Sequence, residues 1–86
     1  MEFTIRVKFN GKFYRYPVKL AEKTEREEVY HVITRAKTLE LRNNRPFFIN
    51  RGLKHRRPTW KMDEALPYKS FTNDIIEEIE KNIGIQ

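Results

Sequence analysis

The sequence predicts an α+β fold, in which a four-stranded antiparallel sheet carries two helices on one face as a two-layer sandwich. Residues 2–20 alternate apolar and polar side chains about a short turn, which is typical of a β-hairpin. Residues 24–41 and 70–83 carry apolar side chains at helical spacing. Extended segments between these two helices complete a ββαββα order, which predicts one domain over residues 1–86.

The hairpin is the most strongly specified element. Its turn is Asn10-Gly11, a pair that readily adopts the left-handed dihedral angles of a type I′ turn. Strands at residues 2–9 and 12–20 then place Val7 opposite Tyr14, with the large apolar side chains on one face. The opposite face collects Thr4, Arg6, Lys8, Phe13, Arg15, Pro17 and Lys19. Pro17 cannot donate a ladder hydrogen bond, so its side of the second strand is expected at a sheet edge or a bulge.

A helix is predicted to follow the hairpin. Thr24 and Glu27 have the spacing of a capping box, in which each side chain bonds the backbone of the other residue. The apolar stripe of this helix consists of Val29, Val32, Ile33, Ala36 and Leu39. Pro46 ends the helix, because a proline disfavours helical dihedral angles in the preceding residue.

The second half is predicted to repeat the order of the first. Residues 47–49 and 59–62 are strand-like. The final helix is expected to have Ser70 or Thr72 as its cap and Gly84 as its stop. Its apolar face consists of Ile75, Ile76, Ile79 and Ile83, and Glu77 is expected to pair with Lys81. A hairpin followed by a helix and a strand also has the outline of a β-grasp module, which is the alternative architecture.

Composition excludes several classes of protein. The chain has 86 residues and no cysteine, so disulfides, thiolate nucleophiles and zinc fingers are ruled out. No segment approaches the roughly 20 apolar residues of a membrane-spanning helix. The first residues lack the basic and then apolar layout of a secretory signal, which predicts a cytoplasmic protein without membrane association.

Charge is distributed unevenly along the chain. The net charge is +6, and residues 42–62 carry seven basic side chains and no acidic one. Residues 1–20 are also basic, whereas residues 63–86 carry six acidic and two basic side chains. This alternation predicts a molecule with one positive face, which favours an anionic partner.

Basic and aromatic side chains together predict nucleic-acid binding, through the outer face of the sheet and the 51–61 loop. Basic groups neutralise phosphates, and an exposed ring such as that of Phe13 stacks on bases. The predicted contact residues are Arg6, Lys8, Phe13, Arg15, Lys19, Arg51, Lys54, His55, Arg56, Arg57 and Lys61. The open sheet favours single strands or RNA slightly over duplex, whereas the arginine-rich loop could equally enter a DNA groove, so the sequence leaves the choice between DNA and RNA open. The only tryptophan, Trp60, is expected in the core rather than on this surface.

Catalysis is not predicted. His55 lies between basic residues that could hold a phosphodiester, yet no tyrosine or carboxylate is tied to it by spacing. No paired histidine and carboxylate spacing resembles a metal site, and no cofactor is predicted. The alternative function is a protein-interaction module, either an adaptor or an inhibitor, that docks on an acidic partner or offers its edge strand.

Overall fold

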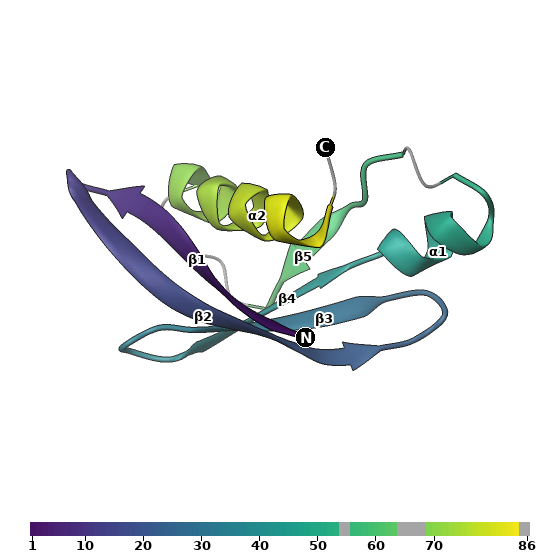
Figure 1. Ribbon diagram of the computed structural model, residues 1–86, viewed down its shortest axis with the longest axis horizontal. Helices are drawn as coiled ribbons and strands as arrows, with labels where there is room; N and C mark the ends of the chain where they lie inside the picture. The colour runs from purple at the N-terminus through teal and green to yellow at the C-terminus, as the bar shows by residue number, and fades with distance from the viewer. Residues whose placement is uncertain (54–55, 64–68, 85–86) are drawn as a thin grey trace.

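The computed structural model describes residues 1–53, 56–63 and 69–84 (Figure 1). Over these residues five strands form one antiparallel sheet in the order β1-β2-β3-β4-β5. The elements are β1 (Glu2–Phe9), β2 (Lys12–Lys23), β3 (Glu28–Ile33), β4 (Thr38–Asn43), α1 (Arg45–Asn50), β5 (Trp60–Met62) and α2 (Lys69–Ile83). The α+β class is as predicted, whereas the strand count and the ββαββα order are not.

The predicted hairpin is confirmed in its bounds and its register. Val7 lies opposite Tyr14, as the alternation required. Asn10 and Gly11 have φ angles of 51° and 77°, the left-handed values of the expected turn. The pairing of β2 with β3 begins at Val18, directly after Pro17. The proline therefore lies where β2 becomes an edge of the sheet, as predicted.

The helix predicted over residues 24–41 is wrong, because this segment forms the β3–β4 hairpin. The hydroxyl of Thr24 accepts hydrogen bonds from the backbone N–H of Arg26 (3.2 Å) and of Glu27 (3.0 Å). The side-chain bond that would cap a helix here closes a turn between β2 and β3. The hydroxyl of Thr34 repeats the arrangement with the N–H of Lys37 at 3.1 Å, between β3 and β4.

Burial with a period of two decides between helix and strand in this segment. Tyr30 and Val32 on β3 are fully buried, and they lie opposite Leu41 and Leu39 of β4. A helix would have buried only one stripe of these side chains, whereas the two strands bury all four. Without a helix after the first hairpin, the β-grasp alternative is also wrong.

Residues 47–49 form part of α1 instead of the predicted strand. Pro46 lies in the first turn of this helix, where its fixed φ angle is favourable and its missing N–H costs nothing. The side chain of Asn43 accepts a hydrogen bond from the N–H of Arg45 at 2.8 Å and so directs the chain from β4 into the helix. The proline that was expected to end one helix therefore begins another.

Helix α2 covers one face of the sheet (Figure 1). Ile75 and Ile79 are fully buried and Ile83 nearly so, in one cluster with the apolar side chains of β1 to β4. Gly84 has a φ of 84° and ends the helix as predicted. The helix begins at Lys69, so both proposed caps lie inside it, and Lys81 pairs with Glu78 at 2.9 Å rather than with Glu77.

Packing of α2 on the sheet is expected to supply much of the stability. Ile79→Ala removes a fully buried side chain and should lower the free energy of unfolding by about 2–4 kcal/mol. Ile33→Ala is the control, since Ile33 is 45% exposed and should cost less than about 1 kcal/mol. Urea unfolding followed by Trp60 fluorescence measures the free energy of unfolding of both variants. An equal decrease in the two would contradict this account of the core.

Candidate nucleic-acid interface

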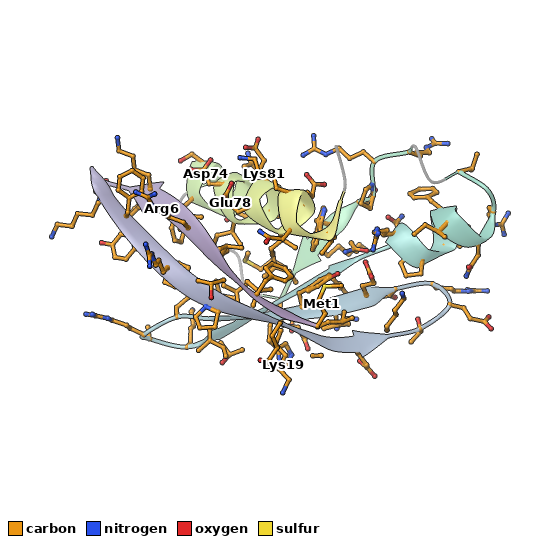
Figure 2. The ribbon with its side chains drawn as sticks, viewed as in Figure 1. Met1, Arg6, Lys19, Asp74, Glu78 and Lys81 are labelled. Carbon is orange, nitrogen blue, oxygen red and sulfur yellow. The ribbon has the colours of Figure 1, made fainter. Side chains whose placement is uncertain are left out.

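Strand register determines which side chains lie on the face opposite α2, here called the outer face. Its members are Glu2, Thr4, Arg6, Lys8, Phe13, Arg15, Pro17, Lys19, Glu22, Val29, His31, Ile33, Thr38, Glu40, Arg42 and Lys61. Figure 2 shows Lys19 projecting from the sheet on this side. All six sheet residues predicted to bind nucleic acid thus belong to one face.

Phe13 is the most exposed aromatic side chain of the outer face, at 57%. The guanidinium carbon of Arg6 lies 4.0 Å from the centre of the Phe13 ring, and Lys8 Nζ lies 5.7 Å from it. Lys8 is the cross-strand partner of Phe13. The ring therefore stands in solvent with two cations beside it, which matches the sequence-based expectation for this position.

The outer-face cations differ in their surroundings. Within the described parts of the chain, Lys8, Arg15, Lys19 and Lys61 have no carboxylate oxygen within 4.0 Å. Arg6 has none either, but it lies at the edge of the sheet near α2 (Figure 2). There it lines a hollow of about 280 Å³ together with Lys8, Phe13 and the acidic residues of α2, which are Asp74, Glu77 and Glu78. Arg6 therefore borders a negative region rather than the centre of a positive one.

Glu40 neutralises the middle of the outer face. Its carboxylate lies 3.2 Å from His31 Nε2 and accepts a hydrogen bond from Arg42 at 3.3 Å. Arg42 also pairs with Glu27 at 3.6 Å. Side-chain hydrogen bonds shared with Asp63, and those with His31 and Arg42, hold the pKa of Glu40 below its ordinary value. The positive charge of this face is consequently concentrated on β1 and β2 and on β5.

Two arginines after α1 stack on phenylalanines. The guanidinium of Arg51 lies 4.4 Å from the ring centre of Phe47, and that of Arg56 lies 5.5 Å from the ring centre of Phe48. This segment lies on the α2 side of the sheet (Figure 1), so the structure does not join it to the outer face as the sequence predicted. Lys54 and His55, the other predicted contacts of the loop, lie outside the described residues.

Arg57 has an acidic partner, contrary to the expectation from its neighbours in the sequence. It donates two hydrogen bonds to Glu80 of α2, at 2.8 and 3.3 Å, and this carboxylate raises the pKa of Arg57. The same carboxylate accepts a hydrogen bond from Trp60 Nε1 at 3.1 Å. The Trp60 ring is half-buried beside Tyr30, with 5.9 Å between ring centres, which confirms the core position expected for it.

A second polar cluster joins β3, α1 and the end of α2. Glu28 is 1% exposed and accepts a hydrogen bond from Arg45 at 3.3 Å. Arg45 also donates to the carbonyl oxygen of Ile83 at 3.2 Å. Burial, and then the charge of Glu28, raise the pKa of Tyr30, which keeps that hydroxyl protonated. Arg45 is therefore committed to internal contacts, and the seven cations of residues 42–62 overstate the charge available to a ligand.

Among the described residues, no group of three or more histidine and acidic side chains could hold a metal ion. Likewise, none of the helices described is both long and apolar enough to cross a membrane. Comparisons with protein-family models, curated proteins and solved structures gave no match to this chain.

The contact between Glu80, Arg57 and Trp60 is expected to be structural. Glu80→Ala leaves the indole N–H of Trp60 without its acceptor and should lower the free energy of unfolding by about 1–3 kcal/mol. Glu77→Ala, on the exposed side of the same helix, is the control and should change it by less than about 0.5 kcal/mol. Urea unfolding of both variants measures the difference. An unchanged free energy of unfolding in Glu80→Ala would show that the segment containing Arg57 and Trp60 is held by other contacts.

Proposed function

We propose that this protein is a cytoplasmic, non-catalytic protein that binds single-stranded nucleic acid through the β1–β2 part of its outer face. The single observation that supports this most is the exposed Phe13 ring beside Lys8 and Arg15, two cations without a carboxylate partner among the described residues. An aromatic ring stacks on a base of any sequence, and neighbouring cations contact the phosphates on either side. Sequence-independent binding follows from this chemistry.

A single strand is favoured over a duplex. A protein that reads the major groove commonly inserts a helix with a basic face. Here α2 carries four acidic side chains at Asp74, Glu77, Glu78 and Glu80, and α1 has only six residues. The sheet instead offers an open surface on which unstacked bases have room to contact Phe13.

The proposed contact residues are fewer than those predicted from the sequence. Lys8, Phe13, Arg15 and Lys19 form the central group on β1 and β2, with Lys61 on β5 as an outlying cation. Arg57 is excluded because its guanidinium is engaged by Glu80. Arg51 and Arg56 are not residues of the sheet; they stack on Phe47 and Phe48 of α1 and are left out of the central group.

Binding should depend on salt in proportion to the phosphates contacted. Contact with about four phosphates predicts that log affinity falls with log salt at a slope of about −3. Replacing Arg15 and Lys19 by Gln removes two contacts, so the slope should become shallower by about 1.4. Fluorescence anisotropy with labelled oligothymidylate and oligouridylate of equal length measures both slopes.

The matched control removes the same charge away from the proposed surface. Lys23 lies at the far end of β2 and Arg26 in the β2–β3 turn, and replacing both by Gln lowers the net charge equally. This double variant should keep the slope of the unaltered protein. If both double variants made the slope shallower by the same amount, net charge alone would explain the attraction. Absence of binding at low salt would refute the proposal.

A further inference from the structure

Strand β2 extends well beyond its partner β3. Its pairing with β1 runs from Lys12 to Lys19, whereas its pairing with β3 begins only at Val18. Residues 12–16 therefore have a neighbouring strand on one side alone. Figure 1 shows the reason, since the β1–β2 hairpin rises toward α2 while the β3–β4 hairpin continues in another direction.

Register determines which main-chain groups of this segment are unpaired. The two-residue turn makes Phe9 and Lys12 a hydrogen-bonded pair, so alternate β2 residues from Lys12 onward bond β1. The main chain of the intervening residues, Phe13 and Arg15, points to the other side. These two residues present two N–H and two C=O groups along an open edge, because the carbonyl of Pro17 faces Ile33 where the β2–β3 ladder begins.

This edge borders a cleft of about 790 Å³ between β2 and the β3–β4 turn. Its lining consists of Lys12, Phe13, Tyr14, Arg15, Tyr16, Pro17, Ile33, Thr34, Arg35 and Ala36. Three of these side chains are basic and none is acidic. The rings of Tyr14 and Tyr16 are stacked with 6.1 Å between centres, and Ile33 is 45% exposed, so the cleft also offers apolar surface.

We propose that the β2 edge at residues 13–16 binds an extended acidic segment of another protein, which adds to the sheet as a further strand. The open N–H and C=O groups would form the ladder, and alternate side chains of the segment would contact the two sides of the cleft. Lys12, Arg15 and Arg35 select the charge of the partner. A second copy of this chain would bring the same three cations against their equivalents, which disfavours self-association through this edge.

This inference is independent of the proposed nucleic-acid function. A peptide ladder uses the main chain of β2, whereas phosphate and base contacts use side chains. A nucleic acid has no alternation of amide donors and acceptors that could match the edge. Removal of one edge N–H therefore separates the two modes of binding.

Arg15 provides the decisive pair of variants. Arg15→Pro removes both the charge and the edge N–H, while Arg15→Thr removes the charge alone. The N–H of Arg15 does not bond β1, and Pro17 already occupies an equivalent position two residues on, so the hairpin should form in both variants. Circular dichroism and thermal unfolding check the fold of each.

The probe is a fluorescein-labelled peptide of alternating glutamate and valine, measured by anisotropy. Arg15→Thr should weaken its binding a few-fold, and Arg15→Pro should weaken it about tenfold more through the lost hydrogen bond. The same peptide with N-methyl groups on alternate residues lacks the N–H donors of the ladder and should not bind the unaltered protein. This test does not depend on the folding of any variant. Bound peptide should also slow hydrogen exchange of the Phe13 and Arg15 amides.

Other results would overturn the inference. Equal affinities of Arg15→Pro and Arg15→Thr, or undiminished binding of the N-methylated peptide, would show that side-chain charge alone attracts the probe. Equal binding of a peptide with lysine in place of glutamate would remove the acidic specificity. No peptide binding together with oligonucleotide binding would assign the cleft to the nucleic-acid surface, whereas peptide binding without oligonucleotide binding would refute only the proposed function.

Discussion

A single buried face organises this small domain. The side chains of alternate residues in four strands meet under α2, where Ile75 and Ile79 are completely excluded from solvent. The strands bury one side only, because one helix of this length covers one face of the sheet. The opposite face consequently carries mostly polar and charged side chains, with Val29 as its buried exception, and the divergence of the two hairpins leaves part of β2 without a neighbour. Both proposed binding surfaces thus follow from the same arrangement of the core.

Two buried carboxylates determine which cations remain available to a ligand. Glu80 holds Arg57 and the indole of Trp60, and Glu28 holds Arg45 against the end of α2. These contacts attach the segment after β4 to the rest of the domain. Their consequence for function is that the most basic quarter of the sequence contributes less to the exposed charge than its composition indicates. The β1–β2 hairpin, with fewer basic residues, keeps more of them unpaired.

Local signals predicted the first hairpin and the final helix correctly, because a type I′ turn and a run of isoleucines at helical spacing each specify their own geometry. Residues 24–41 form two strands instead of the predicted helix for a physical reason. A threonine hydroxyl that accepts a backbone N–H two or three residues on serves a helix cap and a tight turn equally well. The exposure of Phe13 could be derived from strand parity. The pairing of Arg57 with Glu80 spans 23 residues, and the open β2 edge depends on the unequal lengths of β2 and β3, so neither could be derived from local sequence.

The central claim is that the face opposite α2 is the one that meets nucleic acid. Residue-resolved mapping tests it most directly: two-dimensional amide spectra of the labelled protein are recorded while a short oligothymidylate is added. The account predicts that the largest shifts fall on the β1–β2 hairpin around Phe13 and Arg15, and that the amides of α2 change little. Shifts concentrated on α1 and the residues that follow it, with the hairpin unchanged, would contradict the account.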